Sequence, residues 1–151
     1  MKGVSENDNT ETLSLGATNY FSRKKGQFIY GKQNLFNGAF GLIPDKLDGF
    51  LSSSDVPTLD INHKKLNGTF LVCYFSRESF YKKLEGLASG SGSKRIHETT
   101  LLDIKIHLPS LEEQAQIANF LSVINKKLET EKLILGNYIK QKRYLLNQMF
   151  T

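Results

Sequence analysis

A repeating stripe of seam residues runs along the C-terminal part of the chain and restricts what it can fold into. From Ile117 to Met149 these positions are spaced alternately four and three residues apart without a break. A stripe with this average spacing packs against a second helix of similar length and does not wrap a compact core. The segment therefore predicts a long helix that pairs with another helix. Its pairing positions are Ile117, Leu121, Ile124, Leu128, Glu131, Leu135, Tyr138, Lys142, Leu145 and Met149.

Two charged seam residues and a capping motif refine this prediction. Glu131 and Lys142 interrupt the apolar seam. Polar residues at such positions cost stability and select the register, and an antiparallel partner could bring opposite charges together. Upstream, Ser110 to Glu113 fits the capping box S-x-x-E, in which the serine and the glutamate each satisfy a free amide at a helix start. The long helix therefore begins at a defined point.

The rest of the chain is expected to form one globular domain. Residues 1–109 are enough for a single core, and 39% of the chain is apolar, which is adequate for a folded protein. We predict an α+β fold, with a short-stranded, β-rich domain and a few short helices over 1–109 and a long coiled-coil helix over 110–151. Strands are expected at 12–15, 19–21, 27–30, 39–43, 56–61 and 103–108, and two short helices between Phe70 and Leu87, with Ser76 as N-cap of the second.

The chain lacks the patterns typical of metal sites, cofactor sites and membrane proteins. Its one cysteine, Cys73, lies in an apolar run and is expected to be a buried thiol. His63, His97 and His107 are scattered, so we predict no metal. We also predict no cofactor, because the run 88–95 lacks the glycine directly before Lys-Ser/Thr that a phosphate-binding loop needs. Without a long apolar run or an N-terminal signal pattern, a cytoplasmic protein is expected.

The positive charge of the chain favours an anionic partner. The net charge is +5, and residues 17–44 contain four basic and no acidic residues, interleaved with six aromatic ones. Such a segment suits a surface that holds phosphate and stacks on bases. The alternative is that the aromatic residues belong to the core and the cations to a solvated loop. A second segment, 88–95, is rich in serine and ends in Lys94-Arg95, which fits either a contact with a nucleic-acid backbone or a flexible connector.

Several of these motifs occur together in one known family. The stretch Leu108–Gln114 reads Leu-Pro-Ser-Leu-Glu-Glu-Gln, and the helix after it ends in Gln-Met-Phe. This combination resembles the specificity subunit of type I DNA restriction-modification systems, in which a strand leads through Pro-Pro-Leu-x-Glu-Gln into a spacer helix closing on Gln-x-Met-Phe. Ser110 replaces the second proline here. The Asn-Gly-Ala stretch within 28–41 and the segment 87–96 resemble parts of target recognition domains, so the resemblance covers 13–150.

The resemblance implies a non-catalytic protein that selects a DNA sequence. In the family, methyltransferase and restriction subunits dock on the specificity subunit and carry out the chemistry. Members usually hold two recognition domains, each reading half of a bipartite double-stranded site, apart on two antiparallel helices. This chain has one domain and one helix, so it is expected to be either a half-subunit that dimerises or a piece of a longer protein. Its helix would pair with a second copy or with another specificity subunit.

The resemblance and the charge pattern together suggest DNA contacts. Arginine and lysine suit guanine, and asparagine and glutamine suit adenine. Two other functions compete with DNA recognition: a structural protein that oligomerises through its helix, and a standalone enzyme such as a methyltransferase, which would need a cofactor site. The candidates for base contacts are Lys32, Gln33, Asn34 and Asn37, and those for phosphate contacts are Arg23, Lys24, Lys25, Ser91, Ser93, Lys94 and Arg95.

Overall fold

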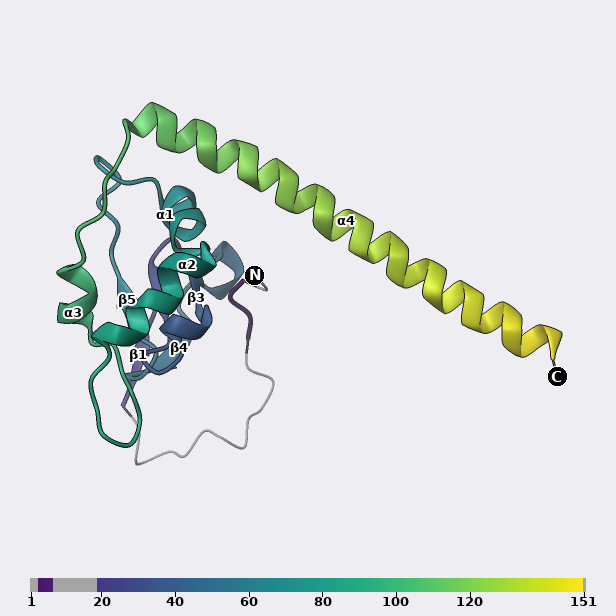
Figure 1. The fold of residues 1–151 in the computed structure, drawn as a ribbon, viewed down its shortest axis with the longest axis horizontal. Coiled ribbons are helices and arrows are strands. Elements are labelled where there is room, and N and C mark those ends of the chain that lie inside the picture. Colours follow the sequence, from purple (N-terminus) through teal and green to yellow (C-terminus); the bar gives the residue numbers. More distant parts are fainter. Residues whose placement is uncertain (1–2, 7–18, 151) are drawn as a thin grey trace. The chain divides into compact units, whose positions relative to one another are not determined.

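Short antiparallel strands form two small sheets in the N-terminal part of the chain (Figure 1). The computed structural model describes residues 3–6 and 19–150. Strand β1 (Tyr20–Ser22) pairs with β4 (Leu51–Ser53). In the second sheet, β2 (Phe28–Tyr30) lies between β3 (Phe40–Leu42) and β5 (Thr58–Leu59). The strands expected around 19–21, 27–30, 39–43 and 56–61 are therefore confirmed, although each is shorter than expected or shifted by a residue. Strand β4 was not predicted. The expected strand at 12–15 lies outside the described residues.

Strand β2 lies between two hydrophobic clusters because its side chains alternate between its faces. Phe28 and Tyr30 belong to the main core cluster, whereas Ile29 packs in a smaller cluster with Ile43 and Leu47. In the main cluster the ring centroids of Phe28 and Phe75 are 5.2 Å apart. The fully buried strand thus joins both parts of the globule.

Helices α1 (Gly68–Phe75) and α2 (Glu78–Tyr81) follow, and the 3-10 helix η4 (Lys82–Leu87) continues α2. Both short helices were expected, but Ser76 is not the N-cap of the second. It is the C-cap of α1, where its hydroxyl donates to the Val72 carbonyl at 2.6 Å. A serine hydroxyl can bond back to the carbonyl four residues earlier, and this interaction uses Ser76 at the end of the first helix.

The expected strand at 103–108 is wrong. Helix α3 (Glu98–Leu102) lies just before it, and no strand is assigned from 103 to 110. Ile104 and Ile106 still pack against the main core while Lys105 is exposed. The alternation therefore reflects alternating burial in an irregular segment that has no strand ladder.

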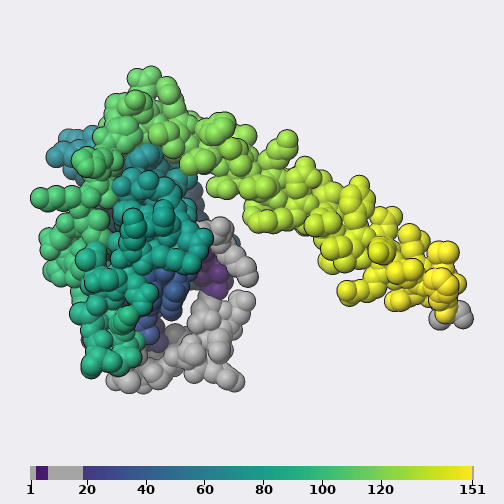
Figure 2. All heavy atoms as spheres, in the orientation of Figure 1, coloured from purple at the N-terminus to yellow at the C-terminus, as the bar shows by residue number. Residues whose placement is uncertain are grey.

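Helix α4 (Leu111–Met149) confirms the long helix and its capping box. The backbone N–H of Ser110 donates to Glu113 Oε2 at 2.9 Å, and the Glu113 N–H donates to Ser110 Oγ at 3.3 Å. Its 39 residues make it about 58 Å long. The chain divides into two compact units, Met1–Ala115 and Gln116–Thr151. Figure 2 shows the side chains of the second unit in light green to yellow.

Candidate nucleic-acid interface

Lys24 and Lys25 occupy the turn between β1 and β2, and both are exposed. Gly26 follows them with φ +78°, a left-handed conformation that favours glycine and so closes the turn. The Lys25 amide donates to Asp48 Oδ1 at 2.9 Å, and its Nζ lies 3.4 Å from Asp45 Oδ1. Exposed ion pairs contribute little, so this pair leaves the lysine available for exchange with a phosphate.

Arg23 is engaged inside the globule. Its guanidinium donates to Ser52 Oγ at 2.7 Å, to the carbonyls of Ser53 and Val56 at 3.3 Å each, and to Thr58 Oγ1 at 3.4 Å. Burial lowers the pKa of Arg23, with a smaller opposing effect of Glu98. These contacts give the side chain a role in holding β4, β5 and the connection between them, which lie in different sheets.

Lys32 follows β2 and is also tied to the globule. Its backbone N–H donates to the Asp55 carbonyl, and its carbonyl accepts from the Ile96 N–H, both at 2.9 Å. Its Nζ lies 3.0 Å from Glu98 Oε1, and the lysine side chain is only 12% exposed. Burial alone would raise the pKa of Glu98, but a backbone hydrogen bond and Lys32 bring it below its ordinary value.

Asn34 and Asn37 lie at the 3-10 helix η2 (Leu35–Asn37), and both are exposed. The Asn37 Nδ2 group donates to Asn34 Oδ1 at 3.2 Å. Gln33, just before them, is half-buried. The interaction leaves the Nδ2 group of Asn34 as a donor and Oδ1 of Asn37 as an acceptor on neighbouring exposed side chains.

The second basic segment forms a closed loop and is not a free connector. Ser89 and Arg95 exchange two backbone hydrogen bonds, of 2.9 and 2.8 Å. Lys94 Nζ lies 2.7 Å from Glu85 Oε1, and Arg95 Nε lies 3.3 Å from Asp55 Oδ1. Ser91 and Ser93 are exposed within the loop.

The structure brings Lys32 and Arg95 together around Asp55. The backbone of Asp55 accepts from Lys32, while its carboxylate pairs with Arg95. The Tyr30 hydroxyl donates to the Ile96 carbonyl at 3.3 Å and further fixes this segment on the end of β2. Sequence reasoning missed Asp55, because nothing in the pattern shows that a carboxylate lies beside an arginine 40 residues away.

The aromatic residues among the basic ones belong mostly to the core. Phe28, Tyr30 and Phe40 are buried and cannot stack on bases. Phe21 is exposed, with the Arg23 guanidinium carbon 5.2 Å from its ring centroid. The sequence left two interpretations of this segment, a surface that stacks on bases and an aromatic core with solvated cations. The burial of Phe28, Tyr30 and Phe40 supports the second for these aromatic residues.

Gln114, which sequence reasoning missed, anchors the start of α4. Its side chain accepts from the Asn67 N–H at 2.8 Å and donates to the carbonyls of Lys65 and Pro109, at 3.1 and 2.9 Å. The residue is only 1% exposed. The signal was its place in the Leu-Pro-Ser-Leu-Glu-Glu-Gln motif, but a buried role for a glutamine does not follow from periodicity.

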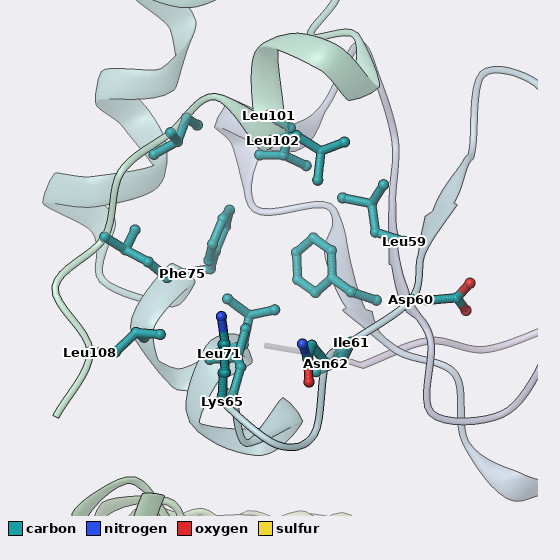
Figure 3. A pocket seen from close by; sticks show the side chains of 14 residues that line it. Leu59, Asp60, Ile61, Asn62, Lys65, Leu71, Phe75, Leu101, Leu102 and Leu108 are labelled. Carbon is teal, nitrogen blue, oxygen red and sulfur yellow. The ribbon is translucent and has the colours of Figure 1, made fainter. Parts of the chain in front are cut away.

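A cavity of about 290 Å³ opens between β5, α1 and the segment 101–108. Its walls are mainly apolar, and Leu71, Phe75, Leu101 and Leu108 face it in Figure 3. Asp60 at its edge accepts from Gln27 Nε2 at 2.8 Å. The polar residues of the lining, Asp60, Asn62 and Lys65, are outnumbered by apolar ones.

Residues 3–6 and 19–150 carry neither a cluster of metal ligands nor a membrane-spanning helix. No group of three histidine, cysteine or acidic side chains that could hold a metal ion occurs there. Within the same residues, no helix combines the length and the apolar character needed to cross a bilayer.

Cys73 is half-buried, where the sequence suggested a buried thiol, and burial raises the pKa of its thiol.

Comparison with known proteins assigns the chain to a family. Residues 3–141 match the sequence model of the type I restriction modification DNA specificity domain, and the chain belongs to this family. The chain is 33% identical over 150 residues to the type I restriction enzyme MjaVIII specificity subunit of Methanocaldococcus jannaschii, covering 93% of this chain and 35% of that protein. It is also 33% identical over 90 residues to a second protein of that organism, covering 60% of this chain and 21% of the relative, which bears the name "Putative type I restriction enzyme MjaX specificity subunit". The chain thus spans about a third or less of the length of these relatives.

Proposed function

We propose that this chain recognises a DNA sequence for a type I restriction-modification complex. The observation that carries the proposal is the family match over residues 3–141, together with 33% identity to a specificity subunit over 93% of the chain. In this proposal the N-terminal unit reads one half of a double-stranded site and has no catalytic role. Methyltransferase and restriction subunits bound to it carry out the chemistry, in the cytoplasm.

The exposed loops offer the DNA contacts. Lys24, Lys25 and Lys94 are exposed cations suited to phosphate, and Ser91 and Ser93 can donate to it. Arg95 remains a candidate because its pair with Asp55 is partly exposed. In this proposal Arg23 and Lys32 mainly hold these loops in place. Direct contacts of these two residues with DNA stay predictions.

Base reading fits the pair formed by Asn34 and Asn37. Adenine presents an acceptor, N7, and a donor, N6, in the major groove. The donor left on Asn34 and the acceptor left on Asn37 match this pattern. Gln33 and Lys32 complete the set of predicted base-contacting residues.

Duplex binding at two salt concentrations tests the proposal. We expect binding of a labelled duplex at about 50 mM salt and a loss of affinity at about 200 mM, with a slope near −0.9 for each neutralised phosphate. Replacing Lys24 and Lys25 by alanine should reduce both affinity and slope. Replacing Lys126 and Lys127 on α4 removes the same charge and should change them less. If the unaltered chain fails to bind at low salt, DNA recognition is wrong and a structural interaction protein becomes the better interpretation.

The sequence that is read can be found with the partner enzyme. Purifying the chain with its methyltransferase subunit and mapping methylated positions in genomic DNA should reveal a site in two parts. A symmetric site would indicate two identical recognition domains, and an asymmetric site two different ones.

The second part of the proposal is that α4 pairs with another helix, from a second copy or from another specificity subunit. Its support is the row of exposed apolar seam residues, among them Leu128, Leu135, Tyr138 and Met149, which range from 51 to 74% exposed. Such a row in water is stabilised when a second apolar helix covers it.

A further inference from the structure

The two charged residues in the seam of α4 complement each other. Glu131 and Lys142 are both exposed, and over the described part of the chain neither belongs to an ion pair. Their apolar neighbours in the seam, Leu128, Leu135 and Leu145, are at least half exposed. Any helix that packs against these leucines also places one of its own side chains opposite Glu131 and another opposite Lys142.

We propose that α4 pairs antiparallel with α4 of a second copy, in the register that sets Glu131 of each helix against Lys142 of the other. This inference rests on the helix-pairing part of the proposed function, whose antiparallel arrangement follows the family; it adds the choice of a second copy as the partner and the alignment of the two helices. A two-fold axis between Leu135 and Tyr138 relates the two copies, so the charged contact occurs twice. In the same register Leu128 faces Leu145, Ile124 faces Met149 and Leu135 faces Tyr138.

Other alignments leave the charges uncompensated. In a parallel pair each Glu131 faces the same glutamate and each Lys142 faces the same lysine, so like charges repel. Sliding the antiparallel helices by one heptad sets Glu131 against Leu135 and Lys142 against Ile124. Sliding them the other way sets Glu131 against Met149 and Lys142 against Tyr138. A charge covered by an apolar side chain without a partner is strongly unfavourable.

The complementarity favours a second copy over an unrelated helix. One chain provides both members of each charged pair and both members of each apolar layer. The paired stretch from Ile124 to Met149 is about 39 Å long, which exceeds three heptads. A heptad pattern sustained over three to four heptads is typical of a coiled coil.

Charge reversal tests which residues face each other. Glu131→Lys should raise the dimer Kd about tenfold or more, because two attractive contacts become repulsive. Combining it with Lys142→Glu should restore the Kd to within about threefold of the original. Lys140→Glu, which makes the same charge change away from the seam, is the control and should have little effect. Sedimentation equilibrium measures all four proteins.

Cysteine cross-linking reads the register directly. In a Cys73→Ala background, the pair Leu128→Cys and Leu145→Cys should form a covalent dimer on oxidation. The pair Leu128→Cys and Tyr138→Cys, which would face each other after a slip of one heptad, should not, because that slip displaces the helices by about 10.5 Å. Leu128→Cys alone should also stay uncoupled, since only a parallel pair brings two such positions together.

Several results would overturn the proposal. These are cross-linking of the Leu128→Cys and Tyr138→Cys pair, cross-linking of Leu128→Cys alone, failure of the double charge reversal to restore dimers, and a monomeric unaltered chain at micromolar concentration. Because these measurements contain no DNA, duplex binding by the same preparations separates a failure of this alignment from a failure of DNA recognition.

Discussion

Gln114 makes three hydrogen bonds from the first turn of α4 to residues of the N-terminal unit, and its side chain is almost fully buried. The backbone N–H of Asn67 and the carbonyl of Lys65 both find their partners on this one amide. A single side chain therefore connects the loop before α1 to the segment that enters the long helix.

Gln114→Ala should lower the free energy of unfolding by about 2–3 kcal/mol, because it leaves buried backbone groups without partners. Urea denaturation of the full chain measures the change. Gln116→Ala is the matched control, since Gln116 is exposed on the same helix, and should stay within about 0.5 kcal/mol. Equal effects of both substitutions would contradict the anchoring role.

The Lys32–Glu98 pair makes stability depend on pH. The pKa of Glu98 is lowered from 4.5, so the folded state favours the charged carboxylate. Its contribution is present above pH 4.5 and is lost as the pH falls through the lower folded-state pKa. Glu98→Gln should therefore cost about 1 kcal/mol at neutral pH, with a difference that shrinks in acid.

Urea denaturation at several pH values measures this convergence. Asp103→Asn removes an exposed carboxylate that has no ion pair among the described side chains, and it should give a much smaller difference. A Glu98→Gln effect that stayed constant from pH 7 to about pH 3 would contradict the linkage.

Among the helices and strands, the sequence predicted the ones with strong local signals. The capping box at Ser110 and the heptad stripe located α4, and turn residues located β2 and β3. Periodicity failed at 103–108, where alternating burial of Ile104 and Ile106 resembles a strand but no ladder forms. Strand β4 was missed because a three-residue strand is defined by its partner β1 and has little pattern of its own.

The sequence predicted which residue types the candidate interface contains. It did not predict which residues contact them. The exposed lysines and asparagines stand out in the sequence. The partners that hold them, such as Asp55 on Arg95 and Glu98 on Lys32, come from segments brought together only by folding. Arg23 shows the limit most clearly, since a cation expected on phosphate is hydrogen-bonded to β4 and to the connection from β4 to β5.

Placing charges in the seam of α4 tests whether the element pairs at all. Leu128→Lys together with Leu135→Lys should convert dimers into monomers, because each copy would place a lysine in two apolar layers and the dimer would then have four such layers. Light scattering measures the mass. The control, Lys126→Ala with Lys127→Ala, alters two neighbouring residues outside the seam and should leave the mass unchanged. An unchanged mass for the leucine variant would refute self-pairing.

The whole molecule belongs to a family represented by longer proteins, with a relative matched over 35% of its length. The described residues contain one compact N-terminal unit and one long helix. Under the proposed function, a bipartite DNA site requires a second unit of each kind. In the antiparallel dimer proposed above, a second copy supplies both.

The heptad spacing of α4 has a counterpart in DNA. Seven residues of helix advance about 10.5 Å, and three base pairs of B-DNA advance about 10.2 Å. Under the proposed function, with the paired helices lying along the duplex, a slip of one heptad would change the distance between two half-sites by about three base pairs and turn one half-site by more than a quarter of a turn around the duplex. The Glu131–Lys142 contact, by fixing the alignment of the helices, would thus also determine how many unread base pairs separate the two parts of the target.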